Sequence, residues 1–146
     1  MVNAIKVRNR EKRKATGAHF TPPELASVLA RRLLNQLGDA TKDSLRVLDP
    51  SCGEGELLLA IARSAPESIQ HKLILKGVEA DKQSLIYAEQ RFRQIECKNS
   101  EFILGDFLDL AGGYISQLLP FEHCVPNTSL KINADIIIAN PPYVRT

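Results

Sequence analysis

Four short apolar runs, separated by turns and helical patterns, constrain the fold of this 146-residue chain most strongly. Within each run the apolar residues are nearly continuous, which is typical of parallel strands that are covered on both faces. We expect these strands at residues 46–49, 73–79, 101–104 and 134–139. Strands that alternate with helices form βαβ units with right-handed crossovers. The pattern therefore predicts an α/β fold with an open parallel sheet, in which ligands bind at the carboxyl ends of the strands.

The first predicted helix precedes the first strand. Thr21 is a good N-cap residue, Pro22 suits the first helical position, and Glu24 completes a capping box. Gly38 is a suitable C-terminal stop. The apolar residues that indicate this helix by their spacing are Leu25, Val28, Leu29, Leu33 and Leu37.

Three more helices are expected between the strands. One carries the apolar residues of 57–62 and ends near Pro66, and a short one lies near residues 114–119. The longest covers residues 82–95 and is expected to bury Leu85, Ile86, Ala88, Phe92 and Ile95. The sequence between residues 109 and 133 otherwise indicates a loop.

Composition excludes several classes of protein. Hydrophobic residues make up 44% of the chain, which is ordinary for a folded domain. No apolar run reaches the roughly 20 residues that span a bilayer, and residues 1–14 lack the apolar core of a secretory signal, so we expect a cytoplasmic protein. The three cysteines are too widely spaced for a disulfide framework or a zinc site, and we expect reduced thiols at Cys52, Cys97 and Cys124.

Positive charge is concentrated near the N-terminus. Residues 6–14 carry six lysine or arginine side chains against one glutamate, a local charge of +5, so the rest of the chain carries +2 − 5 = −3. We therefore divide the chain into a basic arm at 1–15 and a folded part at 16–146. Such an arm can follow a phosphate backbone, although a solvated tail would have the same composition.

A glycine-rich turn follows the first predicted strand, with the sequence Asp-Pro-Ser-Cys-Gly-Glu-Gly at residues 49–55. Glycines let the backbone approach a ligand closely, and the next helix points its free N–H groups toward that ligand. The spacing differs from the Gly-x-Gly-x-x-Gly of dinucleotide sites. The residues expected to line this cradle are Asp49, Ser51, Cys52 and Gly53. Asp49 would order the loop or meet an ammonium group, and Cys52 has no base to make it a nucleophile.

Two other predicted strands end in residues suited to a nucleoside. Glu79, followed by Ala80, lies 24 residues after Gly55, and its carboxylate can accept hydrogen bonds from ribose hydroxyls. Asp106 can accept from an adenine amino group, and Phe107 can cover the adenine face. A solvent-exposed strand end and a plain core aromatic are the simpler alternatives for Glu79 and Phe107.

The fourth strand leads into Asn140-Pro141-Pro142-Tyr143. Asn140 offers a side-chain carbonyl, and Pro141 offers a backbone carbonyl without an N–H. Two acceptors that converge on an exocyclic NH2 hold both hydrogens and aim the nitrogen lone pair at a methyl donor. Tyr143 can stack on a base. These four residues are the predicted catalytic set, and no metal ligands are predicted.

The motifs and their order resemble the N6-adenine DNA methyltransferases. The resemblance covers residues 16 to 143 and rests on five segments: 17–24, 49–55, 79–81, 106–107 and 140–143. It implies a Rossmann-like S-adenosylmethionine-dependent methyltransferase fold, with Phe20, Thr21 and Pro22 lining the methionine end of S-adenosylmethionine. It also implies direct transfer of the methyl group to the N6 amino group of a flipped adenine in DNA, as in restriction-modification enzymes.

Length is the departure from that family. Its members have about three more strands and a target-recognition domain, whereas this chain stops three residues after Tyr143. We therefore expect the N-terminal part of a catalytic domain, truncated after the fourth strand, with an open sheet edge that can self-associate. Three alternatives stay open: methylation of RNA adenine, methylation of a protein glutamine, and a non-catalytic cofactor-binding remnant.

Overall fold

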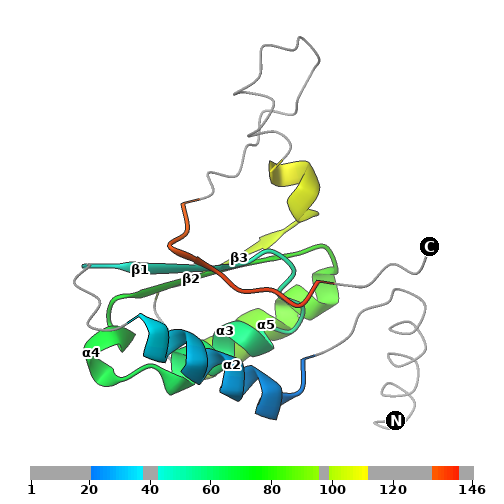
Figure 1. Cartoon of the computed structure of the whole chain (residues 1–146). Coiled ribbons are helices and arrows are strands. Elements are labelled where there is room, and N and C mark those ends of the chain that lie inside the picture. The colour runs from blue at the N-terminus through cyan, green and yellow to red at the C-terminus, as the bar shows by residue number, and fades with distance from the viewer. Residues whose placement is uncertain (1–20, 38–42, 96–98, 112–132, 142–146) are drawn as a thin grey trace, which may run out of the picture.

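A computed structural model describes residues 21–37, 43–95, 99–111 and 133–141. Eight elements follow in chain order: α2 (Pro23–Gln36), β1 (Leu45–Asp49), α3 (Glu56–Ser64), α4 (Glu67–Gln70), β2 (Leu73–Glu79), α5 (Lys82–Gln94), β3 (Ser100–Leu104) and β4 (Ile136–Ile137). Residues 107–111 form a further helical turn after β3. Figure 1 shows the sheet with α2, α3, α4 and α5 beneath it. Within the described ranges, the predicted order of strands and of the helices before and between them is confirmed.

The four strands form one parallel sheet in the order β3-β2-β1-β4. The chain moves outward from β1 to β2 and β3 and then returns to the other side of β1 for β4. The strand order therefore reverses at β1, which is the position where open α/β sheets bind ligands. Asp49 pairs with Gly77, and Glu79 pairs with Leu104, so the polar strand ends lie at one edge of the sheet.

The fourth strand is shorter than predicted. Regular strand pairing covers only Ile136 and Ile137, against an expected 134–139. Backbone contacts with β1 nevertheless continue on both sides, because Asp135 donates to the Arg46 carbonyl and Ile138 to the Leu48 carbonyl, each at 2.9 Å. The chain thus stays beside β1 almost as far as Asn140.

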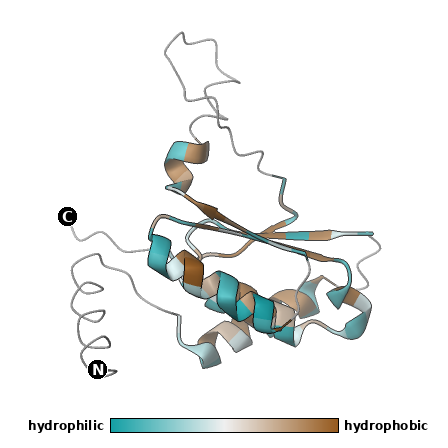
Figure 2. Ribbon diagram, turned by 180° about the vertical axis from the view of Figure 1, so that it is seen from behind, coloured by the Kyte–Doolittle hydropathy of each residue, from teal (hydrophilic) through white to brown (hydrophobic). Residues whose placement is uncertain are grey.

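α3 lies at the centre of the helical layer. Its residues Leu57–Ile61 are all buried, because the sheet covers one side and α2 the other. α5 adds Phe92, whose ring meets the Phe102 ring of β3 edge to face at a centroid distance of 4.9 Å. Ile86, which we expected to be buried, is 37% exposed on the outer side of α5. Figure 2 shows the hydrophobic residues along the strands and the hydrophilic ones on the outward side of α5.

Two details of the first helix differ from the prediction. Its N-cap is Pro22 and Pro23 is its first residue, with no side-chain cap hydrogen bond, so Thr21 and Glu24 do not form the expected capping box. Its buried residues are Ala26, Ala30 and Leu34, while Leu25, Val28 and Leu29 are 40–54% exposed. The small alanines let α2 approach α3 closely, which turns the larger residues toward solvent.

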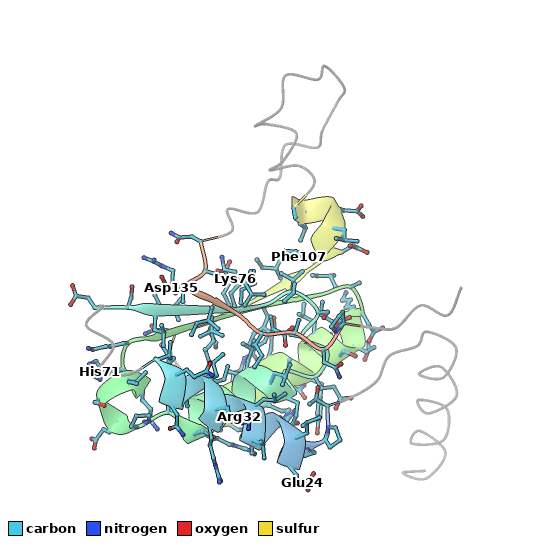
Figure 3. All side chains as sticks on the ribbon, viewed as in Figure 1. Glu24, Arg32, His71, Lys76, Phe107 and Asp135 are labelled. Atoms are coloured by element: carbon cyan, nitrogen blue, oxygen red, sulfur yellow. The ribbon has the colours of Figure 1, made fainter. Side chains whose placement is uncertain are left out.

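The other face of the sheet is buried only in part: Leu48 and Val78 are 2% and 0% exposed, as the continuous apolar runs predicted. Ile74 and Ile137 are exposed there, and Lys76 pairs with Glu101 at 2.9 Å. Figure 3 shows Lys76 and Asp135 on the side of the sheet away from α2. The helix expected near residues 114–119 lies outside the described residues. Among those described, no helix has the length and apolar character needed to cross a bilayer.

Candidate cofactor and target site

Backbone hydrogen bonds bring the polar loops together at the carboxyl edge of the sheet. Cys52 donates to the Val78 carbonyl, which holds the glycine-rich loop against the end of β2. Gly105 donates to the Glu79 carbonyl, which joins the ends of β2 and β3. Each of these bonds measures 2.9 Å. The structure therefore assembles the predicted loops into one site.

The glycine-rich loop takes its shape from two left-handed residues. Gly53 has a φ of 53° and Gly55 a φ of 78°, and Gly55 is the N-cap of α3. A side chain at Gly55 would also lie 3.1 Å from the Phe92 ring and 3.2 Å from Ala88 on α5. Only glycine meets both demands without strain. Gly55 thus fixes both the turn and the contact between α3 and α5.

Two carboxylates order the backbone around this loop. The Asp49 Oδ1 accepts the Ser51 N–H at 3.1 Å. The Glu79 carboxylate accepts the Gly53 N–H at 2.8 Å through Oε2 and the Asp81 N–H at 2.8 Å through Oε1. A carboxylate has about four acceptor positions, so Glu79 retains capacity for further donors. Glu79 is therefore both a loop anchor and a candidate ligand for hydroxyl groups.

Burial raises the pKa of two side chains in the glycine-rich loop, Asp49 and Cys52. Burial raises the pKa of Asp49 from its ordinary 3.8 to about 7; the Ser51 N–H opposes this shift, and the negative Glu79 adds to it. Burial also raises the pKa of the Cys52 thiol far above its ordinary range, helped by the charges of Asp49 and Glu79. Cys52 is therefore a packed thiol rather than a nucleophile.

The hydroxyl of Ser51 is buried and has no hydrogen-bond partner within the part of the chain that the structure describes. Such an orphaned polar atom costs free energy unless a ligand or water satisfies it. It lies in the loop whose two glycines lack a Cβ. A polar ligand with a small, closely approaching end therefore fits this loop.

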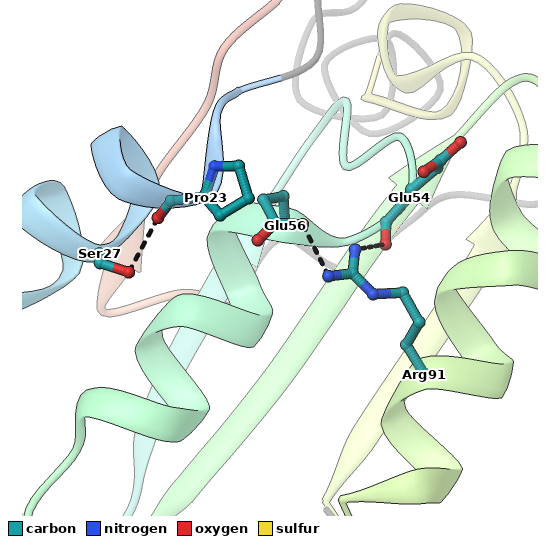
Figure 4. A network of polar contacts seen from close by, with 5 residues as sticks. All are labelled: Pro23, Ser27, Glu54, Glu56 and Arg91. Atoms are coloured by element: carbon teal, nitrogen blue, oxygen red, sulfur yellow. Dashed lines mark hydrogen bonds and ion pairs between the residues drawn. The ribbon is translucent and has the colours of Figure 1, made fainter.

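An arginine that sequence reasoning missed clamps the loop from α5. Arg91 donates to the Glu54 carbonyl at 2.9 Å and pairs with the Glu56 carboxylate at 2.6 Å (Figure 4). Its guanidinium also lies 5.9 Å from the centre of the Tyr87 ring. The partners are 35 and 37 residues away in sequence, and no local motif marks such a pair.

The other predicted nucleoside contacts adopt a different local role. Asp106 accepts the Leu108 N–H at 2.8 Å through Oδ1, so it caps the turn at 107–111. Its second oxygen is the one left to face a ligand. Phe107 is half-buried at the start of that turn (Figure 3). Ala80 is exposed at the end of β2.

The amide of the predicted catalytic turn contacts the segment before α2. Asn140 Nδ2 donates to Thr21 Oγ1 at 3.1 Å, across 119 residues of sequence. Thr21 is only 8% exposed and Asn140 is half-buried, whereas Pro22 and Pro141 are exposed. Phe20, Pro142 and Tyr143 lie outside the described residues. The structure thus joins Thr21 of the first predicted motif to Asn140 of the last one.

The parallel sheet, its switch point at β1 and the helix after the glycine-rich loop define a Rossmann-like methyltransferase fold. Two solved structures share it at a TM-score of 0.61. One is a type I restriction-modification methyltransferase subunit from Streptococcus thermophilus, at 20% identity, matched over 88% of this chain and 25% of its own. The other is a class I S-adenosylmethionine-dependent methyltransferase from Listeria monocytogenes, at 16% identity over 86% of this chain and 32% of its own.

The chain belongs to the N-6 DNA methylase family, whose sequence model matches residues 5–146. It is 38% identical to the type II methyltransferase M.BanIII of Aneurinibacillus aneurinilyticus over 92% of this chain and 23% of that protein. It is 28% identical to the type I restriction enzyme MjaVIII methylase subunit of Methanocaldococcus jannaschii over 87% of this chain and 20% of that protein. The chain therefore spans less than a quarter of the length of these two relatives.

Proposed function

We propose that this chain is the N-terminal part of a site-specific DNA methyltransferase that transfers a methyl group from S-adenosylmethionine to the N6 amino group of adenine. The observation that carries the proposal is the pairing of Asn140 with Thr21 just after β4, the strand that lies beside β1 at the switch point of the sheet. Family membership and the two restriction-modification relatives support DNA as the substrate.

The cradle residues fit the proposed cofactor. The positive-φ glycine at 53 and the orphaned Ser51 hydroxyl suit the small polar methionine end, which Phe20, Thr21 and Pro22 would also line. Asp49 in its ionised form would attract the cofactor's positive groups. Glu79 would add ribose hydroxyls to its two backbone donors, while Asp106 and Phe107 would hold the adenine. When bound, the sulfonium supplies an electrophilic methyl group.

The residues of the turn hold and orient the target nitrogen. The Asn140 Oδ1 and the Pro141 carbonyl accept its two hydrogens, which directs the lone pair toward the cradle. Pro142 stiffens the turn, and Tyr143 stacks on the flipped base. No covalent enzyme intermediate is needed, because positioning of the reactants lowers the barrier by itself, by roughly 7–11 kcal/mol in well-oriented systems.

The partners that complete the enzyme are also part of this proposal. DNA would be bound through the rest of the polypeptide, with further strands beyond β4 and a target-recognition domain. The exposed edge of β4 is where such strands would pair, and in their absence it would favour self-association. This chain spans only 23% and 20% of the two restriction-modification relatives, which supports a longer complete enzyme.

A second candidate is a methyltransferase that acts on a protein glutamine. The chain is 28% identical to a release factor glutamine methyltransferase from Thermodesulfovibrio yellowstonii over 89% of this chain and 38% of that protein. A glutamine amide presents the same planar NH2 group to Asn140 and Pro141. The two candidates thus differ in substrate, but in both the target NH2 group would be held by Asn140 and Pro141.

The test is methylation by a complete protein that contains this chain. Unmethylated genomic DNA and a release factor would each be incubated with S-adenosylmethionine carrying a tritiated methyl group, and the products identified by mass spectrometry. We expect N6-methyladenine in the DNA, and we expect Asn140→Ala to abolish it while cofactor affinity stays similar. Label in the release factor alone would support the second candidate. Full turnover by Asn140→Ala would rule out the proposal that Asn140 holds the target amino group.

A further inference from the structure

The Thr21 hydroxyl is not used by the helix that it precedes. α2 begins with Pro22 as its N-cap, has no side-chain cap hydrogen bond, and closes its first turn through the Ala26 N–H and the Pro22 carbonyl at 2.9 Å. A threonine before a helix usually accepts one of the first free N–H groups. Here Thr21 is buried and its oxygen instead receives the Asn140 amide. The role of Thr21 is therefore something other than capping the helix.

The backbone around Asn140 is anchored on both sides. Ile138 donates to the Leu48 carbonyl at 2.9 Å, and the ring of Pro141 fixes the φ angle of Pro141 itself, directly after Asn140. What remains to be fixed is the orientation of the Asn140 side-chain amide. Its oxygen and nitrogen ends have almost the same size, so rotation of the amide by 180° meets little steric resistance. Hydrogen bonds decide which end faces the target.

We propose that Thr21 is a positioning residue, whose hydroxyl oxygen holds the Nδ2 end of Asn140 and so presents the Oδ1 end to the target amino group. The inference rests on the proposed function. The amide nitrogen can only donate, and therefore the 3.1 Å contact makes the Thr21 oxygen the acceptor. If the amide were reversed, the Asn140 Nδ2 group would face the hydrogens of the target NH2 group. Two hydrogen-bond donors would then oppose each other, and the target would be repelled. Thr21, in the first predicted motif, would thereby orient Asn140, in the last one.

The kinetic test uses a complete, methylation-competent protein that contains this chain. Thr21→Val keeps the shape of the side chain and removes the acceptor, whereas Thr21→Ser keeps the hydroxyl. We expect the single-turnover methyl-transfer rate of Thr21→Val to fall roughly 10- to 100-fold, with affinities for cofactor and substrate within about threefold of wild type. Thr21→Ser should restore the rate to within about threefold.

Ser27→Ala is the matched control, because the Ser27 hydroxyl donates to the Pro23 carbonyl on the same helix at 2.8 Å, away from the turn. It should methylate at the wild-type rate. A wild-type rate in Thr21→Val, an equally slow Thr21→Ser, or a rate loss matched by lost cofactor affinity would each overturn the proposal. In the last case Thr21 would act on the cofactor alone.

A second readout does not depend on activity. In 15N-labelled protein, the side-chain NH2 of Asn140, assigned by its disappearance in Asn140→Asp, should show slow hydrogen exchange and a downfield shift of the proton that Thr21 accepts. Thr21→Val should remove both properties and Thr21→Ser should keep them. Rapid exchange in the wild type would overturn the pairing, even where a variant fails to fold. Absence of methylation in the wild type, with the amide signals as expected, would refute the proposed function rather than the pairing.

Discussion

Glu79 Oε2 accepts the Gly53 N–H at 2.8 Å, so the last residue of β2 holds the tip of the loop that follows β1. The same carboxylate accepts the Asp81 N–H, and Asp81 in turn caps α5 through Ser84. One side chain thus ties two strand ends and a helix start together. A ligand that adds donors to Glu79 would bind to a carboxylate that is already oriented.

Replacement of Glu79 by alanine is expected to weaken S-adenosylmethionine binding by at least about tenfold, because hydrogen bonds to a charged group contribute roughly 1.5–3 kcal/mol. Isothermal titration would measure it. Glu101→Ala is the control, since Glu101 only pairs with Lys76 on the exposed face of β3. Equal affinities in the wild type and Glu79→Ala would remove Glu79 from the ribose role.

Arg91→Met is expected to lower the free energy of unfolding by about 1–3 kcal/mol, because it leaves the Glu54 carbonyl and the Glu56 carboxylate without their partner. Urea denaturation followed by circular dichroism measures this. Arg93→Met removes an exposed pair with Glu89 one turn away and should cost no more than about 0.5 kcal/mol. A loss at Arg91 no larger than that at Arg93 would contradict the clamp.

Gly55→Ala is expected to destabilise the fold by roughly 1–3 kcal/mol, because a Cβ at this left-handed position is strained and also crowds Phe92 and Ala88. Gly105→Ala provides the comparison, since a Cβ there meets only the flexible Leu110 side chain. Its cost should be much smaller. Thermal unfolding of both variants distinguishes them, and equal midpoints would contradict the assigned role of Gly55.

The raised pKa of Asp49 predicts a pH dependence of stability. The folded carboxyl, with a pKa of about 7, holds a proton that the unfolded chain releases near its ordinary 3.8. Its contribution is therefore complete below pH 3.8 and is lost as pH rises to about 7, at roughly 4 kcal/mol for the whole window. Asp49→Asn should be more stable than the wild type at pH 8 and should lose this slope.

The measurement is the unfolding midpoint from pH 4 to pH 8 for wild type, Asp49→Asn and, as an exposed control, Asp43→Asn. Asparagine at 49 still offers an oxygen to the Ser51 N–H, so the loop keeps its local bond. The difference between wild type and Asp49→Asn should widen with rising pH. A constant difference across this range would show that Asp49 ionises as an ordinary carboxyl.

Local patterns predicted the elements well where each one depends on its own sequence. The bounds of β2 match the prediction, and β1 and α3 begin and end within a residue or two of it. The polar residues after the strands converge because parallel strands end at the same edge. That convergence follows from topology, so the sequence was sufficient to predict it.

Tertiary contacts account for what the sequence did not reveal. Thr21 matches an N-cap locally, but its hydroxyl pairs with Asn140 and the helix starts one residue later. The apolar stripe through Leu25 and Leu29 is exposed because Ala26 and Ala30 give the closer approach to α3. In the sequence nothing distinguishes Arg91 from a surface arginine. Its contacts with Glu54 and Glu56 arise only because α5 packs beside the glycine-rich loop. Each case depends on a partner far away in the chain.

The cofactor cradle is the central claim, and isothermal titration of this 146-residue chain with S-adenosylmethionine tests it most directly. The account predicts saturable binding of one cofactor per chain, weakened in Glu79→Ala and unchanged in Glu101→Ala. A chain that circular dichroism shows to be folded, yet takes up no S-adenosylmethionine, would contradict the claim that these loops form the cofactor site.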